Sequence, residues 1–153
     1  MTGIETIIEA EAWRRALPAA VTLAERCFEA ARERDLGLDG EIALLLADDA
    51  ALQALNARFR GKDAPTNVLS FPSTAPGVRG DIALAYETCA REAAEKNVAF
   101  ADHAAHLIVH GLLHLAGLDH QTDADAAAME RLEIDILDGL GISNPYGAPE
   151  GLD

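Results

Sequence analysis

The sequence has no long apolar run, little aromatic character and few basic residues. Its aromatic content is 5%, and no apolar stretch approaches the roughly 18–20 residues needed to cross a bilayer. The segment from Met1 to Glu9 has neither a basic start nor a long apolar stretch, so no signal peptide is expected. We therefore expect a cytoplasmic protein without a membrane partner.

Cysteine is also scarce. Cys27 and Cys89 lie far apart in the chain and form no pair with metal-site spacing. In a reducing compartment both are expected to be buried as small apolar side chains.

Basic residues are scarce relative to acidic ones: the chain has 12 basic and 26 acidic residues, and its formal net charge is −14. Broad, non-specific binding to nucleic acid needs a basic surface, so the composition argues against it, and no DNA partner is expected. A small basic cleft that grips RNA locally stays possible.

The chain of 153 residues predicts one globular domain, since it shows no repeat, linker or low-complexity tract. The pattern predicts strands over residues 4–9, 41–47, 67–71 and 81–85, and helices over 13–34, 48–59, 87–96, 102–116 and 123–140. Pro18 predicts a kink or a late start in the first helix. The predicted fold class is α+β, a small mixed sheet packed with about five helices.

Helical spacing also predicts which side chains point inward. In the first predicted helix the inward stripe consists of Trp13, Leu17, Val21, Ala24 and Phe28. In the second it consists of Leu52, Leu55 and Phe59. The segment from 102 to 116 is apolar on most sides, which is typical of a central helix.

Three histidines on and just after that central helix form the most informative pattern. His110 and His114 are at positions i and i+4, so one ion can reach both imidazoles. Gly117 can end the helix and reverse the chain, which would bring His120 back as a third ligand. We therefore predict one divalent ion, zinc by ligand type, with a coordination position left for water or substrate.

Histidine spacing alone is not decisive. A single histidine on an apolar helix is more often a hydrogen-bonded core residue, and His106 and His110 show the same spacing as His110 and His114. The glycine turn and His120 favour the metal. We interpret His106 as a core residue or a partner of a ligand, whereas His103 has no assigned role.

The spacing from His110 to His120 matches the zincin pattern H-E-x-x-H-x-x-G-x-x-H except at one position. Gly111 stands where those proteases have the glutamate that activates water. A peptidase without its general base would be badly impaired, so peptide hydrolysis is disfavoured.

Together with the segment Leu55–Pro72, which contains Arg60-Gly-Lys62 and Leu-Ser70-Phe-Pro72, the histidine segment closely resembles the YbeY family. Further matches are Gly80-Asp-Ile82, the acidic helix around Met129-Glu130, and Gly141 to Tyr146. These are bacterial rRNA maturation factors, described as single-strand-specific, metal-dependent endoribonucleases that act in 16S rRNA 3′-end maturation and ribosome quality control.

The resemblance implies one zinc ion per chain on His110, His114 and His120, and a functional role for Arg60. It also implies an α+β fold around a metal-bearing cleft, with rRNA precursor and the ribosome or a ribosomal protein as partners. Family members often have aspartate where this chain has Asn67. A role that needs an ionised side chain at that position therefore does not carry over.

We expect Arg60 to clamp the scissile phosphate through its planar donor fork, with Lys62 as a weaker backbone contact. Without the resemblance, Arg60 would be interpreted as an exposed loop arginine paired with one of the many nearby acidic residues. The general base stays open between Asp119, Ser70, Asp81 and no side chain at all. Asp119 could instead orient a ligand or simply close a turn.

A second hypothesis is a metal-stabilised ribosome-assembly factor that docks on a ribosomal protein and has little intrinsic cleavage. The net charge of −14 suits that hypothesis, because an acidic surface complements a basic ribosomal protein.

Overall fold

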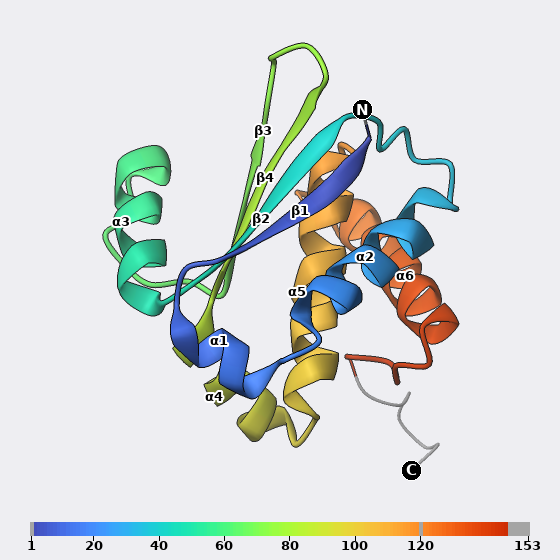
Figure 1. Cartoon of the computed structure of the whole chain (residues 1–153). Coiled ribbons are helices and arrows are strands. Elements are labelled where there is room, and N and C mark those ends of the chain that lie inside the picture. Colours follow the sequence, from blue (N-terminus) through green and yellow to red (C-terminus); the bar gives the residue numbers. More distant parts are fainter. Residues whose placement is uncertain (1, 120, 147–153) are drawn as a thin grey trace.

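The computed structural model describes residues 2–119 and 121–146, which form four strands and six helices (Figure 1). The strands are β1 (Gly3–Ile8), β2 (Glu41–Ala47), β3 (Val68–Pro72) and β4 (Val78–Ala85). The helices are α1 (Glu11–Ala16), α2 (Ala20–Arg32), α3 (Asp49–Arg60), α4 (Tyr86–Lys96), α5 (Phe100–Leu115) and α6 (Asp123–Gly139). The predicted α+β class is confirmed.

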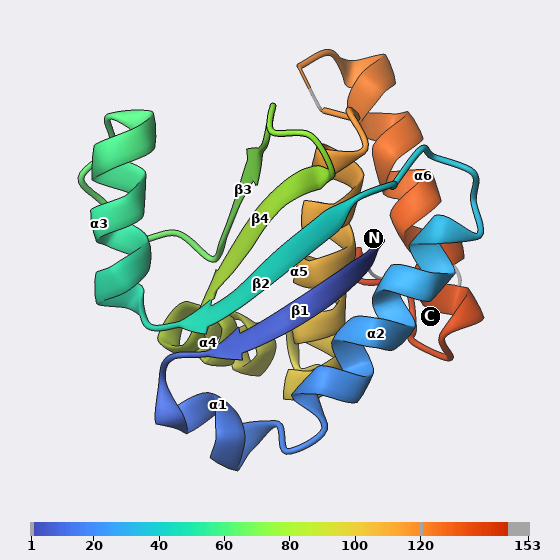
Figure 2. The same cartoon turned by 45° about the horizontal axis from the view of Figure 1, so that its top comes forward.

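The sheet is mixed and has the order β1-β2-β4-β3, with β1, β2 and β4 parallel and β3 antiparallel to β4 (Figure 2). Parallel neighbours cannot be joined by a tight turn, so each parallel pair needs a crossover connection. Helices α1 and α2 cross between β1 and β2, while α3 and β3 lie between β2 and β4 in the chain.

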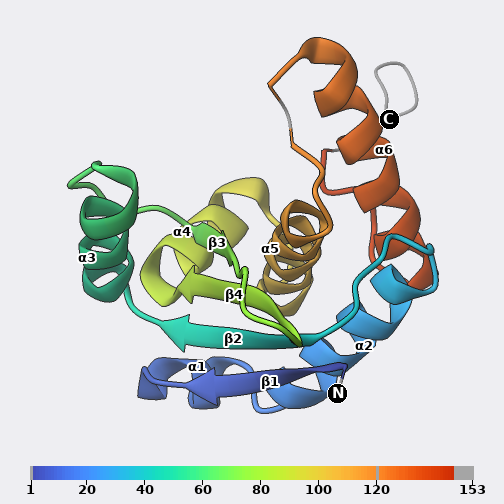
Figure 3. The same cartoon turned by 90° about the horizontal axis from the view of Figure 1, so that it is seen from above.

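Helices lie on both sides of the sheet (Figure 3). Helix α5 packs against β3, β4 and α2, and α6 lies on α5 and α2, whereas α3 stands on the opposite side of β3 and β4. The strand residues Ile42, Leu44 and Ile82 face the α5 side and are at most 2% exposed. A smaller apolar cluster around Leu52 joins α3 to the other face.

The first predicted helix is two helices in the structure. Leu17 precedes Pro18 and has a non-helical backbone with φ −141° and ψ 73°, so α1 ends and α2 starts at Ala20. The residue before a proline is pushed out of the helical region, which explains both the break and the sixth helix. Because α2 begins at Ala20, its buried side differs from the predicted one. Val21 was expected to point inward but is exposed.

The buried positions elsewhere mostly follow the sequence pattern. Helix α5 is buried on most sides, as predicted for a central helix. Both cysteines are fully buried, and burial raises the pKa of each thiol to about 12. Phe59 is the clear exception, because it was predicted inward and is 56% exposed. Within the described part of the chain, no helix has the length and apolar character to span a membrane.

Helix α5 approaches the sheet most closely at Gly111. A Cβ atom added at this residue would lie 2.9 Å from Cγ2 and 3.1 Å from Cδ1 of Ile82, a fully buried side chain on β4. Position 111 therefore points into the packed helix–sheet interface. The glutamate of the zincin pattern could not be accommodated there.

We predict that Gly111→Ala lowers the free energy of unfolding by about 1 kcal/mol. Overpacking costs about 1–3 kcal/mol, which exceeds the gain of about 1 kcal/mol from the helix propensity of alanine. Urea unfolding followed by circular dichroism measures the difference. In an Ile82→Ala background, Gly111→Ala should raise the free energy of unfolding. The contact with the Ile82 side chain is then absent, and only the higher helix propensity of alanine remains. A stabilising Gly111→Ala in the wild-type background would contradict the close approach.

Candidate metal centre and substrate cleft

Two of the three predicted metal ligands lie side by side on α5. His110 and His114 are one turn apart and partly buried, with ring centroids 4.6 Å apart. Their Nε2 atoms are 3.1 Å apart. Two ligand nitrogens at about 2.0–2.1 Å from one tetrahedral zinc ion would be about 3.3 Å apart. The pair is therefore already close to the spacing that a shared ion requires.

A buried carboxylate on α6 orients the first of these rings. Glu133 is 1% exposed, and its Oε1 lies 3.1 Å from Nδ1 of His110. A carboxylate only accepts hydrogen bonds, so His110 donates through Nδ1–H and keeps the lone pair of Nε2 toward His114. A carboxylate behind a ligand histidine is the usual second partner in zinc sites.

The same carboxylate accepts two further hydrogen bonds. His106 donates from Nε2 to Oε2 of Glu133 over 2.7 Å, and the hydroxyl of Tyr146 donates to the same oxygen over 2.9 Å. Burial opposes ionisation of Glu133, but the hydrogen bonds from His106 and His110 outweigh it and lower the pKa of this carboxyl to about 2. The interpretation of His106 as a core residue and partner fits this arrangement.

The third predicted ligand, His120, lies outside the described residues. Within residues 2–119 and 121–146, no group of three histidine, cysteine or acidic side chains could hold a metal ion. Gly117 has φ 100°, and the N–H groups of Gly117 and Leu118 bond back to the carbonyls of His114 and Leu113. These bonds form the predicted glycine turn at the end of α5.

A cleft of about 700 Å³ joins the histidine pair to the end of α3. Arg60 and Lys62 line it from α3 and the loop after it, and Ser70 lines it from β3. Nη2 of Arg60 donates to the carbonyl of Ser70 over 2.8 Å, and its guanidinium lies 5.7 Å from the ring centre of Phe71. These contacts use one of the five guanidinium N–H groups and hold the side chain at the cleft.

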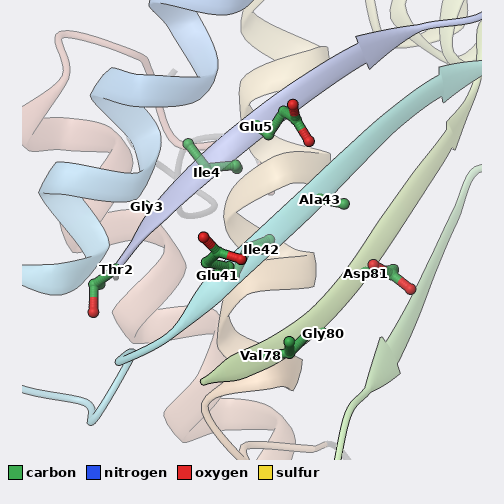
Figure 4. A pocket seen from close by; sticks show the side chains of 10 residues that line it. All are labelled: Thr2, Gly3, Ile4, Glu5, Glu41, Ile42, Ala43, Val78, Gly80 and Asp81. Atoms are coloured by element: carbon green, nitrogen blue, oxygen red, sulfur yellow. The ribbon is translucent and has the colours of Figure 1, made fainter. Parts of the chain in front are cut away.

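The three candidate bases occupy different places. Ser70 lines the cleft, is 8% exposed, and its hydroxyl lies 3.4 Å from the carbonyl of Gly111. Asp119 is exposed and accepts from the backbone N–H of Gln121, as a turn residue does. Asp81 lies on the face of the sheet away from α5, in a hollow that Glu5 and Ala43 also line (Figure 4). Of these three, only Ser70 lines the cleft.

A second hydrogen-bond network supports the far side of the cleft. The amide of Asn67 donates to Oε1 of Glu92 over 3.0 Å, and His103 donates to the same oxygen over 2.9 Å. Burial opposes ionisation of Glu92, but the bonds from His103 and Asn67 hold its pKa below the ordinary value. Burial lowers the pKa of His103. An aspartate at position 67 would place a second carboxylate next to Glu92, whereas the amide of Asn67 donates a hydrogen bond to it.

Sequence reasoning missed Glu133 and Glu92. It offered Asp119 as one option for a carboxylate that orients a histidine, whereas the carboxylate on His110 is that of Glu133. A usable signal existed, because Met129, Glu133, Ile136 and Leu137 form one helical stripe and are all buried. A glutamate on an apolar stripe is rarely buried unless it is paired.

The sequence is similar to a family model and to individual proteins that carry the same name. The family model described as Endoribonuclease YbeY matches residues 7–141. The Endoribonuclease YbeY of a Bradyrhizobium species is 48% identical over 97% of this chain and 95% of its own length. That of a Chelativorans species is 53% identical over 81% of both chains.

A solved structure shares the fold. The solution structure of TM1509 from Thermotoga maritima superposes with a TM-score of 0.61, at 23% identity, over 98% of this chain and 99% of that chain. At this identity the likeness supports the architecture alone.

We predict that Glu133→Ala lowers the free energy of unfolding by about 2–4 kcal/mol, because three donors lose their buried acceptor. Glu133→Gln should cost less, since one oxygen still accepts. Urea unfolding measures both, with Glu130→Ala, an exposed change one turn earlier on α6, as the matched control. Equal stability of the Glu133→Ala and Glu130→Ala proteins would show that the network is unimportant.

Proposed function

Because this chain belongs to the YbeY family of endoribonucleases, we propose that it is a zinc-dependent endoribonuclease that cleaves single-stranded RNA. We propose rRNA precursors as its substrate, with 16S rRNA 3′-end maturation and ribosome quality control as its cellular roles. The observation that carries the proposal is that the paired Nε2 atoms of His110 and His114, 3.1 Å apart, share one cleft with Arg60 and Lys62. Metal-binding nitrogens beside phosphate-binding cations suit a phosphodiester substrate.

The proposed metal ligands are His110, His114 and His120, which would hold one ion per chain. A bound zinc ion would supply Lewis-acid chemistry at the scissile phosphodiester. The donor set fits this ion, since the Glu133 carboxylate keeps His110 in the tautomer whose Nε2 lone pair faces His114. The glycine turn after α5 supports His120 as the third member.

Arg60 would bind the scissile phosphate. Its guanidinium is held by the Ser70 carbonyl on one edge, so the planar fork is oriented before substrate arrives. A pre-oriented donor stabilises charge that develops on phosphoryl oxygens without paying for reorganisation during the reaction. Lys62 lines the same cleft and adds a second cation for the RNA backbone.

The described residues that line the cleft include no carboxylate. We therefore assign no side-chain general base, and the nucleophile is water or the RNA 2′-hydroxyl. The two differ in their products, because attack by the adjacent 2′-hydroxyl leaves a cyclic phosphate and attack by water leaves a linear one. Ser70 would help to shape the cleft through its hydroxyl and its carbonyl.

We predict that Arg60→Ala and His114→Ala each reduce cleavage of a labelled single-stranded rRNA fragment by about 100-fold or more, as loss of one oriented charge-stabilising group does elsewhere. Arg14→Ala, an exposed arginine change on α1, is the control and should cleave normally. Metal analysis should give one zinc ion per wild-type chain and less in the His114→Ala protein, whereas Arg60→Ala should keep its metal.

Two results would overturn this assignment. Cleavage that persists unchanged in both variants would come from a contaminating nuclease. A wild-type protein that holds metal and associates with ribosomes, but does not cleave, would instead match the assembly-factor hypothesis. In that case neutralising exposed acids on α6 should weaken ribosome association, because an acidic surface complements a basic ribosomal protein.

A further inference from the structure

A second depression continues from the cleft onto the other side of the sheet. This groove of about 760 Å³ is lined by residues at the end of α3 and by residues of the sheet, most of them on the face away from α5. It shares Arg60, Ser70 and Pro72 with the cleft, so the two hollows meet at the proposed phosphate-binding arginine. A flexible polymer bound at Arg60 can therefore extend into the groove.

An exposed aromatic ring stands in this groove. Phe59 is 56% exposed, although helical spacing predicts it to be inward. Its ring centre lies 5.3 Å from that of Phe71, with the planes 57° apart, and the Arg58 guanidinium lies 5.2 Å from its ring centre. Phe71 and Arg58 thus lie against the ring, while more than half of the surface of residue Phe59 stays open to solvent.

The charge around the groove is opposite to that of the whole chain. Residues 51–80 contain four basic side chains and one acidic one, whereas the rest of the sequence contains eight basic and 25 acidic side chains. Arg58 and Arg60 line the groove, and Asp81 is the one acidic side chain among its described lining residues. Two guanidinium groups and one carboxylate therefore line the groove, and this balance favours an anionic ligand.

We propose that this groove is a base-binding subsite for single-stranded RNA, in which a nucleobase next to the scissile phosphate stacks on Phe59 and Arg58 contacts the neighbouring phosphate. Cationic grooves with exposed aromatic rings are the usual way in which proteins bind unpaired strands. The subsite also gives a physical reason for single-strand specificity, because a base inside a duplex cannot leave its stack to reach Phe59 without an energetic cost. The inference rests on the proposed function.

The test measures binding of a fluorescent single-stranded RNA by anisotropy, with the full chain and without cleavage in the time of the measurement. Phe59→Ala should weaken binding by about 5- to 150-fold, the range for loss of one base–aromatic stack. Phe59→Leu keeps the apolar contact with Phe71 but lacks a ring, so it should also weaken binding, and Phe59→Trp should not. Val21→Ala removes exposed apolar surface from α2 and serves as the matched control, with unchanged affinity.

Two further readouts separate stacking from a general loss of structure. Removing single bases along the RNA should reveal one position whose loss weakens binding to wild type but has no further effect on the Phe59→Ala protein. Salt dependence should distinguish the two side chains, because Arg58→Ala should reduce the slope of log affinity against log salt by about 0.7, whereas changes at Phe59 should leave the slope unchanged.

Wild-type affinity in the Phe59→Leu and Phe59→Ala proteins would overturn the subsite and leave the groove as a surface for a protein partner. If Arg60→Ala still abolishes cleavage in the same preparations, the nuclease proposal stands while the subsite fails. RNA that neither binds to nor is cleaved by the wild-type protein would overturn both.

Discussion

The Glu133 carboxylate is buried between α5 and α6, where it accepts hydrogen bonds from His106, His110 and Tyr146. An ionised carboxylate at 1% exposure is stable only because these donors replace its lost hydration. The carboxylate therefore needs α5, α6 and the segment at Tyr146 to be docked together. It also orients His110, so the geometry of the His110–His114 pair depends on the packing of the C-terminal part of the described chain.

The other face of α5 has an equally strict requirement. Gly111 lets the helix lie close enough to β4 for Ile82 to fill the space that a side chain would occupy. This contact seats α5 while His110 and His114, on neighbouring positions of the helix, reach the cleft. The resemblance to the zincin pattern thus extends to the histidine spacing but not to the glutamate, because Gly111 at that position packs against Ile82. Gly111 thus leaves no side chain at the position of that glutamate and helps to place the histidines.

Most of the fold could be predicted from the sequence because strand and helix periodicity is local. All four strands and the central helix were expected near their observed positions, and the break at Pro18 followed from a known restriction on proline. Exposure at Phe59 could not be predicted, since spacing shows that a helix has an apolar stripe but not how far the neighbouring sheet extends to cover it. The proximity of the His110 and His114 rings could be predicted from i, i+4 spacing, whereas their role as metal ligands stays a prediction. Glu133 was missed because its partners lie 23 and 27 positions away in sequence.

The charge distribution constrains how such a protein could meet RNA. At physiological salt the Debye length is about 8 Å, so distant acidic surfaces are screened while the arginines of the cleft act at contact. Net charge of −14 nevertheless removes the long-range attraction that speeds the capture of free polyanions. If the chain binds RNA as proposed, binding depends on short-range contacts at Arg58, Arg60 and Lys62, made after the strand has been brought near. Under the proposed function, RNA presented on a particle with basic proteins would satisfy this condition better than RNA free in solution, because such proteins would attract the acidic surface and raise the local concentration of the strand at the cleft.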